Sequence, residues 1–265
     1  EIAIDFLTAT GQACHAERQE FILLSDTLGF SMLVDALNHR RPAGATENTV
    51  FGPFHVAGAP ERAMGERISL DGKGEACRFE GRVTDLAGRP VGGARIDVWS
   101  DNADGFYDVQ QPDLQPRWNN RGVFTTGADG RYGFIGIKPV PYPIPDDGPV
   151  GRMLGHLGRH PQRPAHMHFL VTAPGFQKLT THTFVGDDPH IASDTVFGVK
   201  ASLVAPFEYI GMPMAIFWGV VVFGTWPDHQ AWVGIALICG AGLYTLWRET
   251  VRRKVVDVAA PSGDL

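Results

Sequence analysis

The feature that most constrains the fold is a series of short segments between residues 75 and 173 in which apolar and polar residues alternate. A period of two is typical of β-strands that are buried on one face. Turn residues separate the segments, and the pair Asp129 and Gly130 predicts a tight hairpin between two of them. Several short strands at this spacing predict a mainly β fold, a β-sandwich. The predicted strands span residues 79–84, 94–100, 123–126, 132–137 and 165–173.

The first 74 residues follow a different pattern. Apolar residues recur at helical spacing within residues 2–38, which predicts two or three helices that end at residues 39–42. A stretch rich in glycine and proline, residues 46–74, predicts a linker. We therefore expect an N-terminal helical region over residues 1–74 and a sandwich over residues 75–204. Taken alone, the sandwich is also compatible with a generic prealbumin-like binding domain.

Composition excludes some classes of function. The formal net charge of −6 gives no reason to expect nucleic acid as a partner. The cysteines are few, odd in number and scattered, so they predict free thiols in a reducing compartment rather than a disulfide framework. The first residues have neither the basic start nor the long apolar core of a signal peptide. We therefore expect a cytoplasmic main domain.

Two histidines in the last predicted strand indicate a metal site. His166 and His168 are two positions apart, so their side chains leave a strand on the same face and can reach one ion. Two tyrosines, Tyr107 and Tyr142, lie in segments rich in Asp, Gly and Pro. Phenolate is a hard anionic ligand that favours ferric iron, and a trivalent cation can deprotonate a phenol at neutral pH. From residue type alone, each of the four is more often an ordinary side chain of the fold than a metal ligand.

Six stretches of the sequence are similar to a known family. They are RQEFILLSDTLGFSMLVDALNHRRP, TVFGPFH, ARIDVWSDNADGFYD, RGVFTTGADGRYGFIGIKPVPYPIP, GRHPQRPAHMHFLV and SDTVFGVKASL. Over residues 2–204 the chain resembles the intradiol ring-cleavage dioxygenases, and the hydroxyquinol branch more than the catechol branch. The resemblance implies a prealbumin-like sandwich that uses Fe(3+) and O₂ to open an aromatic ortho-diol. The implied substrate is hydroxyquinol (benzene-1,2,4-triol), giving maleylacetate, and the alternative is catechol, giving cis,cis-muconate. A non-catalytic sandwich that binds iron or another ligand is an alternative of a different class.

The resemblance also implies roles for individual residues. Tyr107, Tyr142, His166 and His168 would hold the iron, and Tyr142 would be the ligand that the substrate displaces. The released Tyr142 would then act as a base for a substrate proton. Arg163 would stabilise negative charge on the ring, whereas its alternative role is a surface charge or a loop ion pair.

A substrate pocket with apolar walls suited to a flat ring is a further implication of the resemblance. Asp26 is the exception among its residues, and the third hydroxyl of hydroxyquinol could be its partner. Asp26 could equally be an ordinary residue of a helix surface or cap. His182 lies where catechol enzymes tend to carry Gln, which also favours the hydroxyquinol branch. The pocket residues implied are Leu23, Asp26, Val50, Phe51, Gly52, Pro53, Ile144, Pro145, Arg163 and Val196.

Residues 205–265 depart from this resemblance. The segments 207–225 and 231–247 are almost entirely apolar or small, and basic residues follow the second. Their lengths approach what a bilayer requires, and the basic flank would stay in the cytoplasm. The stretch resembles the last two helices of an EamA-type drug/metabolite transporter, so we expect a two-helix transmembrane hairpin attached to the inner membrane. The alternatives are a buried helical hairpin, an inactive fusion, and a transport-protein fragment with a soluble passenger.

The N-terminal region bears on the oligomeric state. In the family, the N-terminus usually builds the dimer contact. We expect that part to be missing here, with residues 1–74 truncated relative to the family. A homodimer and a monomer are therefore both open.

Overall fold

The computed structural model of the chain describes residues 1–16 and 18–196. The chain divides into two units, Glu1–Val199 and Lys200–Leu265, and the described residues belong to the first. The transmembrane hairpin expected over residues 205–265 therefore lies outside the described residues. Within the described ranges, no helix is both long and apolar enough to cross a membrane.

The strands form a β-sandwich, as the sequence predicts, and all of their pairings are antiparallel. One sheet has the order β3-β2-β7-β8, a second pairs β1 with β4, and a small third pairs β5 with β6. The strands are β1 (Ala76–Arg82), β2 (Arg95–Trp99), β3 (Arg121–Thr125), β4 (Arg131–Ile137), β5 (Tyr142–Pro143), β6 (Gln162–Arg163), β7 (His166–Thr172) and β8 (Leu179–Phe184).

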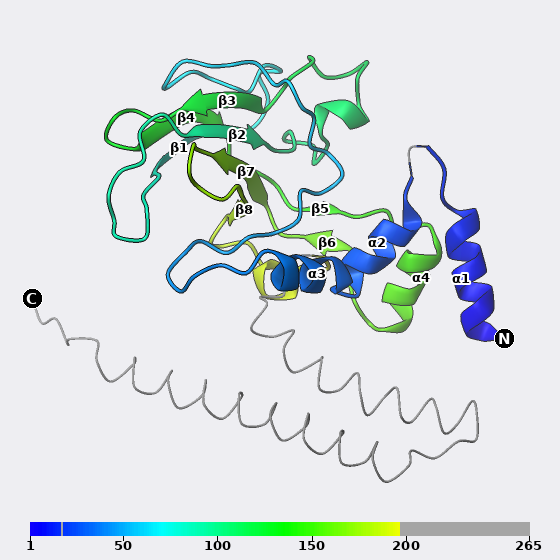
Figure 1. Cartoon of the computed structure of the whole chain (residues 1–265). Helices are drawn as coiled ribbons and strands as arrows, with labels where there is room; N and C mark the ends of the chain where they lie inside the picture. The colour runs from blue at the N-terminus through cyan, green and yellow to red at the C-terminus, as the bar shows by residue number, and fades with distance from the viewer. Residues whose placement is uncertain (17, 197–265) are drawn as a thin grey trace, which may run out of the picture. The chain divides into compact units, whose positions relative to one another are not determined.

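Helices gather at the end of the sandwich where β5 and β6 lie (Figure 1). The N-terminal helices are α1 (Ile2–Gln12), α2 (Glu20–Thr27) and α3 (Phe30–Asn38), and α3 ends at the predicted stop. Gly29 separates α2 from α3 with a φ of 80°, a conformation that glycine adopts without strain. The later helix α4 (Pro149–His156) begins with a proline, whose fixed φ suits a first turn. Because α2 packs against α1, α3 and α4, the helices form one layer.

The prediction of a hairpin at Asp129 and Gly130 is wrong, although a turn forms there with a φ of 75° at Gly130. β3 pairs with β2 and β4 pairs with β1, so the chain crosses from one sheet to the other at this turn. Phe124 of β3 and Phe134 of β4 then stack between the sheets at 4.9 Å. Burial of both rings in the core outweighs the pairing of two strands that are adjacent in sequence.

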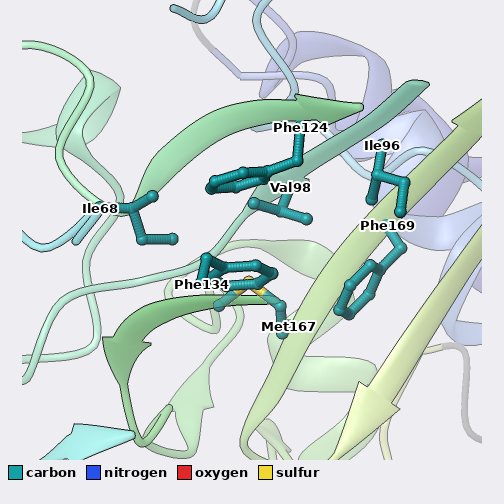
Figure 2. Close-up of a cluster of buried hydrophobic side chains, with 7 residues drawn as sticks. All are labelled: Ile68, Ile96, Val98, Phe124, Phe134, Met167 and Phe169. Atoms are coloured by element: carbon teal, nitrogen blue, oxygen red, sulfur yellow. The ribbon is translucent and has the colours of Figure 1, made fainter. Parts of the chain in front are cut away.

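The core lies between the four-stranded sheet and the sheet of β1 and β4 (Figure 2). β7 shows how it is separated from the opposite face, because alternate residues of a strand point to opposite sides. Met167 and Phe169 belong to the core, so His166 and His168 project from the other face. The cluster consists of Ile68, Ile96, Val98, Phe124, Phe134, Met167 and Phe169.

A cavity of about 730 Å³ opens beside β1 and β4. Four charged residues on its walls form two ion pairs, Arg78 with Glu80 and Arg131 with Asp129, and Arg82 donates to the backbone carbonyl of Asp129. None of the residues predicted to bind iron or substrate lines this cavity. The candidate site therefore lies elsewhere, on the face of β7 that carries the histidines.

Candidate metal centre

Four donor atoms meet at one buried point, and they belong to the four residues expected as ligands. Tyr107 Oη lies 3.1 Å from His168 Nε2 and 3.4 Å from Tyr142 Oη. His166 Nε2 lies 3.1 Å from His168 Nε2 and 3.5 Å from Tyr142 Oη. All four side chains are buried. The atoms form a closed ring, which we call the donor ring.

The donor ring has the dimensions of a site for one metal ion. Donors that share an ion at about 2.0–2.1 Å stand about 3 Å apart, close to the observed 3.1–3.5 Å. His166 Nδ1 donates to Pro164 O at 2.7 Å, which fixes the tautomer and leaves the lone pair of His166 Nε2 facing the ring. A cation would relieve the crowding of acceptor atoms at this point. The residues present therefore fit a metal ion.

Burial controls the protonation of these donors. It lowers the pKa of His166 and of His168 well below the ordinary value, so both are neutral imidazoles, the form that binds metal. Burial also raises the pKa of Tyr107 and of Tyr142, although the charge of Arg163 opposes this effect at Tyr142. Phenols in such surroundings ionise only beside a strong positive charge. The donor ring thus favours a highly charged cation.

Tyr107 is positioned by the loop that follows β2. Its backbone N–H donates to the side chain of Gln110 at 2.9 Å, across a short 3₁₀ turn. The next residue, Asp108, forms a buried ion pair with Arg121 of β3 at 2.7 Å. This pair ties the loop to the sheet, so Tyr107 is held by a rigid strand as well as by its own turn.

Arg163 lies beside the donor ring, because β6 places it opposite Tyr142 of β5. Its Nη1 donates to Tyr142 Oη at 3.2 Å and lies 3.1 Å from His166 Nε2. Its Nε and Nη2 each contact the carboxylate of Asp194 at 3.3 Å. Arg163 is buried, so the surface-charge alternative does not apply. Sequence reasoning missed Asp194, which the need of a buried guanidinium for a carboxylate partner could have revealed.

One of the expected pocket residues, Asp26, is charged, and four others come together in an apolar cluster. Asp26 is buried in α2, where burial raises the pKa of its carboxyl while the hydroxyl of Ser31 and the charge of Arg163 oppose the rise. The charge of Arg163, which contacts the donor ring, therefore also acts on the carboxyl of Asp26. The cluster contains the expected residues Leu23, Val50, Ile144 and Val196, together with Met32 and Leu154.

The other expected pocket residues are placed differently. Phe51 stacks on Trp99 with ring centroids 6.0 Å apart. Gly52 borders the donor ring, since a Cβ at this position would stand 3.4 Å from His168 Cε1. The last two, Pro53 and Pro145, are exposed.

His182 adjoins the donor ring from β8, where it stands opposite His168. The two rings meet edge to face at 4.2 Å. The metal-binding nitrogens of His166, His168 and His182 lie within 4.8 Å of one another. The sequence linked His182 only to the class of substrate, because cross-strand register cannot be read from spacing within one strand.

Comparison with known proteins places this fold and site in a family. The family described as Dioxygenase matches residues 50–216, and the one described as Catechol dioxygenase N terminus matches residues 1–46. The chain belongs to the intradiol ring-cleavage dioxygenase family. This dioxygenase is 62% identical to the hydroxyquinol 1,2-dioxygenase of a Rhizobium species over 208 residues, which cover 78% of this chain and 70% of that relative.

Solved structures give the same assignment. The dioxygenase matches the crystal structure of hydroxyquinol 1,2-dioxygenase from Pseudomonas putida with a TM-score of 0.73 and 55% identity, over 76% of this chain and 70% of that one. In a comparison of sequences, this dioxygenase is 38% identical to the catechol 1,2-dioxygenase of Candida albicans, over 78% of this chain and 69% of the relative. The similarity is therefore greater to these two hydroxyquinol enzymes.

Two expectations about the ends of this dioxygenase change. The match at residues 1–46 overturns the expectation that the family N-terminus is missing. Two of the helices there, α1 and α2, pack against α4, and α3 packs against α2, so all three belong to the body that carries the donor ring. The main family match continues to residue 216, beyond the expected end at 204, and none of these findings supports a transporter segment.

Proposed function

We propose that this dioxygenase is a hydroxyquinol 1,2-dioxygenase, which uses non-haem Fe(III) and O₂ to convert benzene-1,2,4-triol into maleylacetate. The observation that carries the proposal is the donor ring of two phenols and two imidazoles, with Arg163 beside it. Phenolate ligands suit ferric iron. The 62% identity to an enzyme named for this substrate supports the choice of branch. Catechol is the alternative substrate.

Ferric iron held by Tyr107, Tyr142, His166 and His168 would bind both oxygens of an aromatic diol and make its ring reactive toward O₂. We assign Tyr142 the role of the ligand that the substrate would displace and that would accept a substrate proton. Arg163 donates to its oxygen at 3.2 Å, which stabilises the phenolate until the proton arrives.

Arg163 has a second role in the proposal. Its guanidinium is buried and paired with Asp194 at 3.3 Å, and its Nη1 faces Tyr142 Oη at 3.2 Å, so the positive charge lies at the edge of the donor ring. A fixed positive charge in a site that excludes water stabilises negative charge that develops on the substrate ring. Arg163 therefore supports both the released Tyr142 and the reacting diol.

Selectivity is assigned to Asp26 and the apolar cluster around Val50 and Ile144. The cluster supplies flat apolar walls, and Asp26 is a carboxylate that the charge of Arg163 influences. Catechol lacks the third hydroxyl that Asp26 would bind. A buried polar group left without its partner disfavours the analogue that lacks the hydroxyl.

The wild-type enzyme is expected to cleave hydroxyquinol faster than catechol, and Asp26→Asn is expected to remove most of that preference. A hydrogen bond to a charged group contributes about 1.5–3 kcal/mol, or roughly ten- to a hundredfold in kcat/KM. Oxygen uptake and product absorbance give kcat/KM for both substrates. Asp5→Asn, an equal charge change at an exposed site of α1, is the control and should leave the ratio unchanged. A wild type that prefers catechol would refute the substrate assignment, and equal losses on both substrates would clear Asp26 of a selectivity role.

For the end of the chain we propose a transmembrane hairpin that holds the catalytic domain on the cytoplasmic side of the inner membrane. Its support is the sequence alone, in which two apolar segments, 207–225 and 231–247, are separated by a short turn and followed by basic residues. The family match to residue 216 overlaps the first of these segments. Two helices cannot form a transport pathway, so the hairpin would anchor the enzyme without transporting a solute.

Fractionation of cells tests the hairpin. The full chain is expected in membranes after washes with high salt and with carbonate, because only inserted protein resists both. A chain that ends at residue 204 is expected in the supernatant. Recovery of the full chain as a single well-folded species without detergent would contradict insertion and favour a buried hairpin.

A further inference from the structure

The two histidines of the donor ring are held in different ways. His166 Nδ1 donates to Pro164 O at 2.7 Å. His168 Nδ1 is buried and has no hydrogen-bond partner within residues 1–16 and 18–196. Histidines that bind metal usually donate their second ring nitrogen to a carbonyl, a carboxylate or a water, and this contact fixes the ring. The close contacts of the His168 ring are instead with neighbouring aromatic rings.

Trp99 lies flat against the ring of His168. Their centroids are 4.7 Å apart, and their planes differ by only 13°. The register of β2 with β7 places the two residues directly opposite each other, so the sheet itself enforces the contact. His182 abuts the ring of His168 from the next strand, β8, at 4.2 Å and nearly perpendicular. The ring of His168 is thus packed against both neighbours in its cross-strand row.

Trp99 is itself fixed by other rings. Phe51 stacks beyond it, with centroids 6.0 Å apart and planes 14° apart. His55 meets the indole edge to face at 4.6 Å, and His55 Nε2 contacts Asp97 Oδ2 at 3.1 Å. The indole Nε1 of Trp99 is buried without a hydrogen-bond partner in the part of the chain that the structure describes. Ring packing therefore holds Trp99, and Trp99 in turn presents a rigid surface to His168.

We propose that Trp99 is a positioning residue, which by stacking on His168 sets the orientation of that ligand and hence the iron affinity and ligand geometry of the donor ring. The inference rests on the proposed function only in taking iron as the ion. In this arrangement a stacked indole serves at His168 the purpose that the hydrogen bond from Nδ1 to Pro164 O serves at His166. The two imidazole ligands are consequently oriented by different forces.

The test compares Trp99→Leu, which removes the flat surface, with Trp99→Phe, which keeps an aromatic ring and lacks the indole N–H. The readouts are iron affinity by competition with a chelator and the visible charge-transfer absorption of the Fe(III)-loaded protein. Trp99→Leu is expected to lower iron affinity about 10–100-fold, the range typical for loss of an outer-shell partner, and to shift the absorption band. Trp99→Phe should retain most of the affinity and a band close to that of the wild type.

Phe124→Leu is the matched control. Phe124 is also buried and stacked, at 4.9 Å on Phe134, but it belongs to the core on the opposite side of the sheet. This variant should lose stability to urea while keeping the affinity and the band. If Trp99→Leu binds iron as the wild type does, or if Phe124→Leu loses as much affinity, the proposal is overturned.

Phe51→Leu covers the case in which Trp99→Leu does not fold. It removes only the outer ring of the stack and is expected to lower affinity by less, with a band shift in the same direction. Unchanged affinity and an unchanged band in Phe51→Leu would then overturn the proposal. Wild-type protein that binds no iron would instead refute the proposed function, so the two failures are distinguishable.

Discussion

Tyr107→Phe is expected to remove much of the visible absorption of the iron-loaded enzyme and to reduce ring cleavage below detection. The substitution removes one of the two phenolates and keeps the ring that packs on Phe54 at 4.5 Å, so the fold should persist. Loss of an outer-shell partner already costs about 10–100-fold in metal affinity, and loss of a direct anionic ligand should cost more. Metal analysis, absorbance and turnover of hydroxyquinol measure the three effects.

Tyr132→Phe is the control for this prediction. Tyr132 is half-buried, and burial raises its pKa too, but its side chain lines the cavity beside β1 and β4. The variant should keep iron, colour and activity. An iron-loaded wild type without visible absorption would refute the phenolate assignment, as would a Tyr107→Phe variant whose spectrum matches that of the wild type.

Arg163→Met is expected to lower kcat by about 10²–10³-fold, the effect of losing one electrostatic group aimed at developing charge. It is also expected to destabilise the fold by about 3–5 kcal/mol, because Asp194 would be left buried without its partner. Urea unfolding and steady-state kinetics measure the two effects separately.

The double variant Arg163→Met with Asp194→Asn separates catalysis from stability. Removal of the unpaired carboxylate should restore much of the stability, whereas kcat should stay low because no positive charge faces Tyr142. Recovery of kcat in the double variant would show that Arg163 acts only through folding and would overturn its catalytic role.

Local sequence patterns predicted the parts of this molecule that depend on local geometry. The two-residue spacing of His166 and His168 placed both on one face of a strand, and the helical spacing before Asn38 predicted α2 and α3. The turn at Gly130 was also visible. The partner of β3 was not, because pairing is decided by burial of Phe124 and Phe134 between sheets that form from distant parts of the chain.

The surroundings of the donor ring were beyond sequence reasoning for the same reason. Asp194 contacts Arg163 from 31 positions away, and Trp99 reaches His168 only through the register of β2 with β7. Neither residue stands in a motif that spacing alone identifies as functional. The resemblance to the dioxygenase family implied the four ligands and the hydroxyquinol branch, whereas the residues that orient the ligands became visible only in the fold.

The alternation along β7 has a consequence for how this enzyme can change during evolution. Odd and even positions of the strand serve separate tasks, with Met167 and Phe169 in the core and His166 and His168 at the donor ring. Substitutions at either set can therefore accumulate independently. Insertion or deletion of a single residue is different, because it exchanges the two faces, putting imidazoles into the core and apolar side chains at the ring. Along this strand, a substitution on one face leaves the other face in place, whereas a change in length displaces both faces at once.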